Sequence, residues 1–458
     1  MATRELRHRD HRGCGVELGL GLGLVGWLRR LKRRRQLVLA ARMSSPAAPV
    51  ASSGPTGAAT ATTDASIGRP DPCRGRPIGA LGFGGVAIAS FGGPLALAAL
   101  IAPGLLSDAA GSAGLAAVSA AVVFAVPLWI WLSYSRHVNG PGGLFAFVEA
   151  AAGRPIAYLQ AAIWIFSYAL YLVYTTVQIA DQILPDVFAG EHRFQTLLTV
   201  LIPVSIAVVM IAGRVAALAV IGLIAAGQVV LVIALDVVTI GHLSTPVSSF
   251  AAGAPAGSLA KAGAQTSLLF VCGSLPLFLG GELANPARTI RRGLSASYLL
   301  TALVVVLAVA PFAAAPGLAR TTIPGVSIAE QFSGRTFADA IGIGVAVSTA
   351  GVMLCEYLAL SRLIHAISSI RINRVTVALG VAMIVAAPFV LIDPQGFYNT
   401  LSMPSLVALW LSQLIVFAVY PRFAVRHGAR RLSAWMLGAG ASGIAIYGVV
   451  TALAQSSS

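Results

Sequence analysis

The stretch Ser90–Leu95 (SFGGPL) lies in the middle of one long apolar run, and Cys272–Leu277 (CGSLPL) lies in the middle of another. Each stretch places glycine ahead of a Pro-Leu pair. Glycine is a poor helix former, and proline lacks a backbone N–H and clashes with the preceding turn. Both stretches therefore predict a helix that is interrupted near its centre.

The apolar runs around these stretches are long enough to cross a bilayer. Of the 458 residues, 57% are hydrophobic and only 10% are charged, whereas soluble domains carry about 25% charged residues. A helix of about 20 apolar residues spans the hydrocarbon layer. The sequence therefore predicts an all-α polytopic membrane protein with eleven spans, twelve being the alternative. The eleven lie near 80–106, 113–134, 155–182, 195–212, 214–241, 264–283, 294–315, 336–360, 374–392, 400–420 and 432–454.

The positions of the two interruptions predict an internal repeat. They fall on the first and sixth spans, so the two interrupted helices cross the membrane in opposite directions. Unpaired backbone is costly in hydrocarbon and survives only where protein or a polar cavity covers it. Matched breaks of this kind are typical of an inverted five-helix repeat with a binding site at the midplane. A simple kink in each helix is the alternative.

The chain divides into a tail, a core and one further helix. Residues 1–77 are predicted to be a basic, disordered cytoplasmic tail, although translation starting at Met43 is an alternative. Residues 78–395 and 396–420 are predicted to form the ten-helix core, and 421–458 an additional C-terminal transmembrane helix. The net charge is +15, but the basic residues lie in the tail and between apolar runs. We therefore expect them to orient the chain at the lipid bilayer and not to bind nucleic acid.

The loop charges predict the orientation. With the N-terminus inside, the inner loops carry thirteen arginines, and the outer loops carry only Arg193, Lys261, Arg320 and Arg335. Because Lys and Arg concentrate on the cytoplasmic side of membrane proteins, we expect a cytoplasmic N-terminus in the plasma membrane.

Three stretches resemble the amino acid–polyamine–organocation permeases. They are the broken first helix, the loop Gly140–Val148 (GPGGLFAFV), and Glu282–Ile290 (ELANPARTI) at the end of the sixth span. The likeness covers roughly Ile78 to Tyr420. It implies a ten-helix inverted-repeat core that transports amino acids or related amines by alternating access, without a cofactor. It also implies coupling to a proton, to Na⁺ or to exchange. The chain departs from the family pattern in having Gly92-Gly93-Pro94 in the first helix and eleven spans instead of twelve.

The interrupted backbone supplies the predicted substrate site. The N-terminus of a half-helix offers unpaired N–H groups and a partial positive charge to a carboxylate, and free carbonyls suit an ammonium group. The predicted substrate-binding residues are Ser90, Gly92, Gly93, Tyr171, Cys272, Gly273 and Ser274. Tyr171 shares one face of the third span with Ser167 and Tyr174. A seam of interhelical hydrogen bonds is the alternative for that face.

Candidate coupling residues lie on the eighth span. The resemblance implies that hydroxyls at the depth of Ser348 and Thr349 complete an oxygen cage for Na⁺, with hydrogen bonds inside their own helix as the alternative. Glu356 follows on the same face and is the predicted proton-coupling residue. An ion pair with an inner-loop arginine is the alternative for Glu356. Some relatives place a lysine in the fifth span, where this chain has Gln228.

The end of the sixth span supplies residues predicted to close the inner side. Glu282 is expected to pair with an arginine such as Arg292, and Asn285 and Pro286 are predicted to be gating or structural residues beside them. No metal site and no disulfide framework are expected, because the four cysteines contain no CxxC pair.

Other functions were weighed against transport. An intramembrane enzyme needs paired chemical groups at one depth, and none of the seven histidines falls mid-span. A channel is also possible, but two breaks at the midplane suit a closed binding site better than a continuous pore. A transport-inactive membrane sensor or scaffold with the same fold is the remaining alternative. The oligomeric state is not predicted.

Overall fold

The computed structural model describes residues 77–188, 194–243, 251, 253–368 and 370–454. The predicted tail up to residue 76, with Met43, and Arg193 lie outside this described part. Within it, ten helices are long and apolar enough to cross a membrane, and α9 (Gln195–Ile211) is a shorter apolar helix. A span needs at least about 17 residues, and α9 has that length. With α9, which is fourth in chain order, the described residues contain eleven spans. The predicted all-α polytopic fold is confirmed.

Several spans are built from more than one helical segment. In chain order they are α2 (Ala80–Ser90) with α3 (Pro94–Ala96), η1 (Leu97–Ile101) and α4 (Ala102–Ser107); α5 (Ala113–Ser135); α7 (Arg154–Val177) with η3 (Gln178–Ile183) and α8 (Leu184–Val187); α9; α10 (Arg214–Ile240); α11 (Ala256–Ser267) with η5 (Leu268–Glu282); α12 (Pro286–Leu307) with α13 (Val309–Ala314); α15 (Arg335–Ser368); α16 (Ile372–Val390); α17 (Pro394–Arg426); and α18 (Arg431–Ala454). Short helices α6 (Leu144–Ala152) and α14 (Pro324–Ser333) join the second span to the third and the seventh to the eighth.

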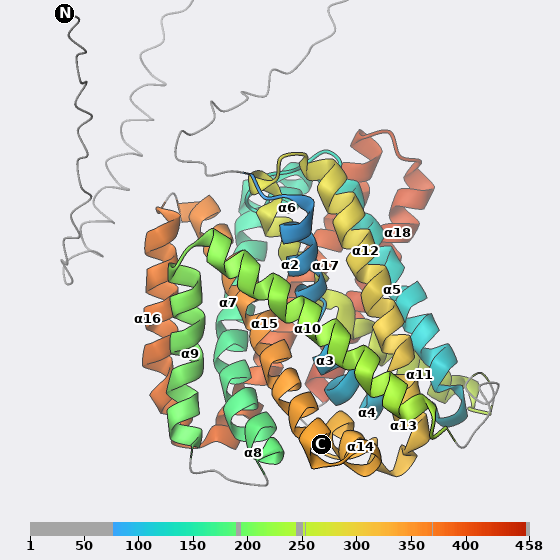
Figure 1. Cartoon of the computed structure of the whole chain (residues 1–458). Coiled ribbons are helices and arrows are strands. Elements are labelled where there is room, and N and C mark those ends of the chain that lie inside the picture. The colour runs from blue at the N-terminus through green and yellow to red at the C-terminus, as the bar shows by residue number, and fades with distance from the viewer. Residues whose placement is uncertain (1–76, 189–193, 244–250, 252, 369, 455–458) are drawn as a thin grey trace, which may run out of the picture. The chain divides into compact units, whose positions relative to one another are not determined.

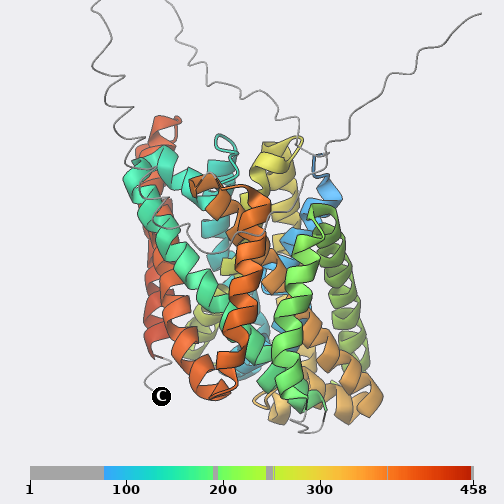
Figure 2. The same ribbon diagram turned by 90° about the vertical axis from the view of Figure 1, so that its left-hand side faces the viewer.

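The spans stand side by side in one bundle, and α10 crosses its front obliquely in Figure 1. Helices α9 and α16 pack together at one edge, and α18 packs against α17 (Figures 1 and 2). The start of α2 and the end of α18 lie at opposite ends of the bundle, as an odd number of spans requires.

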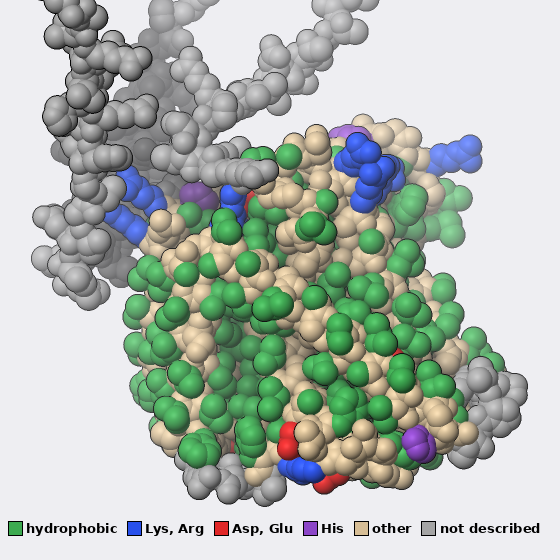
Figure 3. All heavy atoms as spheres, viewed as in Figure 1, with side chains coloured by type: hydrophobic (Ala, Val, Ile, Leu, Met, Phe, Trp, Pro, Cys, Tyr) green, Lys and Arg blue, Asp and Glu red, His purple; other side chains and the backbone are tan. Residues whose placement is uncertain are grey.

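The surface of the bundle suits lipid. Leu81, Val215 and Leu223 are more than three-quarters exposed, and many other large apolar side chains are more than a third exposed. Figure 3 shows hydrophobic side chains over the middle of the bundle and most Lys and Arg side chains at its upper end. Inside, small residues let helices approach closely: a methyl group on Gly85 of α2 would come within 2.9 Å of the Gly222 Cα of α10. Such small-residue contacts are typical of membrane helix packing.

The first span is broken where the sequence predicts. Helix α2 ends at Ser90, and Gly92 and Gly93 follow with φ values of +93° and +69°. Side chains with a Cβ rarely adopt these angles. Pro94 then opens α3 at the first position, where its missing N–H costs nothing.

The sixth span departs from α geometry in a different way. Helix α11 ends at Ser267, and the chain continues as a 3₁₀ helix, η5, for 15 residues. Runs of 3₁₀ helix longer than three or four residues are uncommon. The predicted irregularity around Gly273 is therefore confirmed, but it takes the form of a tightened helix, and the expectation of an unwound turn is wrong.

Candidate functional site

The two irregular stretches meet at the centre of the bundle. A Cβ built on Gly273 would collide with the Phe91 ring, so the ring lies directly over the Gly273 backbone. Phe91 is fully buried, and its ring also neighbours Phe270 and Tyr298 at centroid distances of 6.4 and 5.9 Å. Ser90, just before the break, is buried and donates its hydroxyl to Ala87 O within its own helix.

Ser348 of α15 caps the second half of the first span, which begins at Pro94. Its Oγ accepts the backbone N–H of Ala96 at 3.1 Å. The first N–H groups of a helix lack partners within the helix, so α15 satisfies one of them for α3. A Cβ on Gly93 would collide with this same oxygen. Thr349 instead donates to Val345 O at 2.9 Å, which is the alternative expected for it from the sequence.

Gln228 of α10 faces the same corner. Its Oε1 lies 3.2 Å from the position of a Cβ on Gly93, and its Nε2 lies 3.4 Å from that of a Cβ on Gly351. The side chain is 2% exposed, and neither amide atom has a hydrogen-bond partner among the described residues. The break, α10 and α15 thus enclose an uncharged polar group that is free to bind something further.

Glu356 is a buried carboxylate without a direct partner. It is 0% exposed, and neither oxygen accepts a hydrogen bond in the part of the chain that the structure describes. Helix α15, which carries Glu356, packs against α7 and η5. The alternative ion pair with an inner-loop arginine is not formed by the described residues. Since a lone charge at this depth is costly, Glu356 calls for a proton or a cationic ligand.

Aromatic rings line the third span from the centre outward. The centroid distances are 4.1 Å from Trp164 to Tyr168, 6.0 Å from Tyr168 to Tyr171, 4.8 Å from Tyr171 to Tyr174 and 5.6 Å from Tyr174 to Tyr398 of α17. Tyr168 donates its hydroxyl to Cys272 Sγ at 3.9 Å, which links this row to η5.

The sequence prediction missed Tyr168, because it favoured the face of Ser167 and Tyr171. In the structure Ser167 turns to α17, where it and Ser405 each donate a hydroxyl to the other's carbonyl at 2.7 and 2.8 Å. The alternative of an interhelical seam therefore holds for Ser167, and the rotation of α7 brings Tyr168 to the centre.

Ser274 also turns toward α17. Its hydroxyl accepts Gln413 Nε2 at 3.1 Å and donates to Val271 O at 3.3 Å. Ser274, a predicted substrate-binding residue, thus follows Gly273 in the sequence, but its side chain is hydrogen-bonded to the tenth span, α17.

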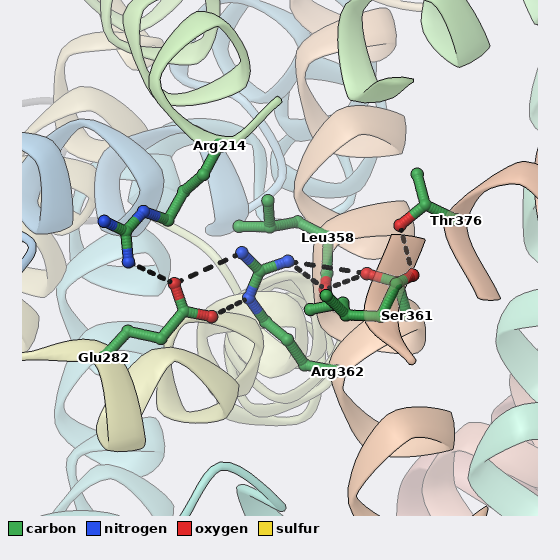
Figure 4. A network of polar contacts seen from close by, with 7 residues as sticks. Arg214, Glu282, Leu358, Ser361, Arg362 and Thr376 are labelled. Atoms are coloured by element: carbon green, nitrogen blue, oxygen red, sulfur yellow. Dashed lines mark hydrogen bonds and ion pairs between the residues drawn. The ribbon is translucent and has the colours of Figure 1, made fainter. Parts of the chain in front are cut away.

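An ion-pair network closes one end of the bundle (Figure 4). Arg362 of α15 contacts both oxygens of Glu282, at 2.7 and 3.4 Å, and Arg214 of α10 contacts one at 3.1 Å. The side chains of Glu282, Arg362 and Arg214 are 20%, 6% and 25% exposed, so the network is largely buried. The predicted pairing of Glu282 with Arg292 is wrong. Helices α10 and α15 pack so that Arg214 and Arg362 pair with Glu282 instead. Arg292 is exposed.

The stretches that carry the family resemblance pack against each other at this end. A Cβ on Gly281 would lie 3.1 Å from the Pro141 ring, and one on Gly143, where φ is +52°, would meet the Phe278 ring. Asn285 is the N-cap and Pro286 the first residue of the next helix, α12, and the Asn285 side chain makes no capping bond.

The opposite end carries a more exposed ion-pair cluster. Asp108, which follows α4, pairs with Lys261 of α11 at 3.1 Å and with Arg320 at 3.2 Å. The Lys261 and Arg320 side chains are 60% and 75% exposed. Exposed pairs stabilise by about 1 kcal/mol or less, so this end is held more weakly than the Glu282 end.

The fold is that of known membrane transporters. MhsT, solved in complex with L-phenylalanine, matches with a TM-score of 0.57 and 14% identity over 84% of this chain and 100% of that chain. A Na⁺-coupled sialic acid symporter, in a substrate-bound outward-open state, matches with a TM-score of 0.54 and 10% identity over 82% of this chain and 90% of that chain. No protein-family model matches the sequence, and no curated protein does. At these identities the likeness establishes the fold class alone: a polytopic α-helical membrane protein built like these two transporters.

Proposed function

We propose that the protein is a secondary active transporter that moves amino acids or related amines across the plasma membrane by alternating access. The observation that carries this proposal is the interrupted backbone at Phe91–Gly93, buried at the centre of the bundle against Gly273 and Ser348. Irregular backbone in hydrocarbon persists where it binds something or is covered by protein. Membership of the amino acid–polyamine–organocation permeases is part of the proposal, and enzymatic activity is not.

The ligands named for both structural neighbours support this assignment. One was solved with bound L-phenylalanine, and the other is a Na⁺-coupled symporter of sialic acid. In the present chain, the N-terminus of α3 would receive a substrate carboxylate. The carbonyls near Gly92 and Cys272 would receive an amine. A substrate larger than a few atoms requires the Phe91 ring to swing away from Gly273.

Two coupling mechanisms are supported by different residues. Ser348 touches the broken first span, which favours Na⁺ held between its hydroxyl, Thr349 and first-span carbonyls. Glu356 is a lone buried carboxylate, which favours a proton. In either case the ion binds a group that is exposed to only one side of the membrane at a time.

The ion pairs at the two ends fit the roles of inner and outer closures. Glu282 with Arg214 and Arg362 would close the cytoplasmic end, and Asp108 with Lys261 and Arg320 the outer end. The gathering of basic side chains at the Glu282 end supports a cytoplasmic N-terminus (Figure 3).

The test is transport by the full chain in liposomes. We expect a panel of radiolabelled amino acids and amines to show uptake or exchange that responds to an imposed Na⁺ or proton gradient. A Gly93→Leu variant serves as the inactive control. Absence of uptake, exchange and substrate binding in correctly folded protein would refute transport and favour the sensor or scaffold.

A further inference from the structure

We propose that α7, η5 and α17 enclose a second polar site, which binds an uncharged group able both to donate and to accept hydrogen bonds. The site, here called the glutamine layer, is formed by Gln160, Gln413 and Ser274. It adjoins the central site, because Ser274 follows Gly273 and Trp164 of the same helix as Gln160 stacks near Tyr168. Its link to substrate selection rests on the proposed function, but its existence does not.

The register of two helices places the glutamines at one level. Ser167 of α7 and Ser405 of α17 exchange hydrogen bonds. Seven residues onward on α7, Tyr174 packs against Tyr398, which lies seven residues earlier on α17. The helices are therefore antiparallel in constant register. Seven residues in the other direction, Gln160 falls opposite Ser412 and Gln413.

Contacts with η5 complete the layer. Gln413 donates to the Ser274 hydroxyl at 3.1 Å. The rings of Trp164 of α7 and Phe278 of η5 lie 4.6 Å apart. Side chains of η5 thus touch both α7 and α17 on the Glu282 side of the break.

The layer contains more hydrogen-bonding capacity than it uses. Gln160 and Gln413 are both 0% exposed. Four buried atoms here have no partner among the described residues: Gln160 Nε2, Gln160 Oε1, Gln413 Oε1 and Trp164 Nε1. Buried polar groups in native proteins are nearly always satisfied, so each exception needs an explanation. Two of these atoms are donors and two are acceptors. A ligand group that satisfies them must itself both accept and donate hydrogen bonds.

The segments that form the layer offer no charged partner to a ligand. Within one turn of Gln160, Gln413 and Ser274, their own segments contain no acidic or basic residue. An isolated ion would lack a countercharge at this depth. The matching groups are water and the uncharged polar end of a transported solute, such as a carboxamide or hydroxyl.

Stability and selectivity together test the site, using full-length Gln160→Met, Gln413→Met and Gln182→Met. Methionine keeps the volume and removes the hydrogen-bonding amide. Gln182 lies near the outer end of the same span, where it bonds Gln395 at 3.5 Å, and is the matched control. The readouts are the apparent Tm of purified protein and, in liposomes, competition of uptake by glutamine against leucine.

Gln160→Met is the deciding variant, because Gln413→Met also breaks the bond to Ser274. If the layer is occupied, Gln160→Met lowers the Tm by about 3 °C, and its effect is not additive with that of Gln413→Met. If Gln160→Met also lowers the preference for glutamine over leucine by about tenfold or more, the group bound in the layer belongs to the transported solute. An unchanged preference together with the lower Tm assigns it to water.

A higher Tm for Gln160→Met with unchanged selectivity would overturn the proposal, because removing an unsatisfied buried amide stabilises a protein. If the wild-type protein transports nothing, the proposed function fails while the Tm comparison still decides the occupancy of the layer.

Discussion

Neutralising Glu282 is expected to shift the protein toward a conformation open at the Glu282 end. In the structure this carboxylate holds η5 to α15 and α10 through Arg362 and Arg214. Glu282→Gln keeps the shape of the side chain but leaves the guanidinium of Arg362, which is 6% exposed, without a countercharge.

The magnitude follows from burial. Breaking a fully buried pair costs about 3–5 kcal/mol, and the 20% exposure of Glu282 reduces this figure. We expect a loss of about 2–3 kcal/mol for the closed arrangement. Since 1.4 kcal/mol is a factor of ten, the open population should rise by about 30- to 140-fold.

Alkylation of Cys272 reports this shift. Cys272 is 7% exposed at the centre, and Cys14 and Cys73 are first replaced by serine so that they do not react. The labelling rate of purified protein, followed by mass spectrometry, should rise with the open population. Glu149→Gln is the matched control, because Glu149 pairs with Arg154 at the surface, with side chains 38% and 69% exposed. An unchanged labelling rate in Glu282→Gln, with transport also unchanged, would refute the closing role of the network.

Three further outcomes are expected. Gly93→Ala should abolish uptake, because φ is +69° and the new methyl group collides with Ser348; Gly84→Ala, which meets nothing within 4 Å, should leave uptake intact. Glu356→Gln should abolish the stimulation of uptake by an inward proton gradient while exchange persists, and an unchanged pH profile would exclude proton coupling through this residue. Ser348→Ala should destabilise the protein by about 1 kcal/mol through loss of the cap on Ala96, measured by thermal unfolding, and should weaken any Na⁺ dependence of transport; equal Na⁺ dependence in both proteins would remove Ser348 from the ion site.

The break in the first span was predictable because it is a local property. Two adjacent glycines followed directly by a proline disfavour a continuous helix wherever they occur. The same rule applied to Cys272–Leu277 predicted the loss of α geometry but not the 3₁₀ form, because packing under the Phe91 ring decides which irregular backbone is adopted.

Long-range partners were not predictable in the same way. Thirteen inner-loop arginines were available to Glu282, and helix packing alone determines that Arg362 and Arg214 reach it. Tyr168 was missed for a related reason, whereas the role predicted for Tyr171 stays a prediction. Ser167 and Tyr168 are adjacent and differ by about 100° in direction, so the helix rotation that turns Ser167 to α17 turns Tyr168 to η5. Gln160 gave no signal in the sequence, since its unmet amide becomes evident only when the opposing helix is in place.

The cap on α3 has a mechanical consequence. The backbone N–H of Ala96 in α3 donates to the Ser348 hydroxyl on α15. Separating α3 from α15 would leave this buried N–H without a hydrogen-bond acceptor. Rearrangements of the bundle should therefore carry α3 and α15 together as one rigid body. Flexing is left to the Phe91–Gly93 hinge, where positive φ angles already set the chain apart from regular helix.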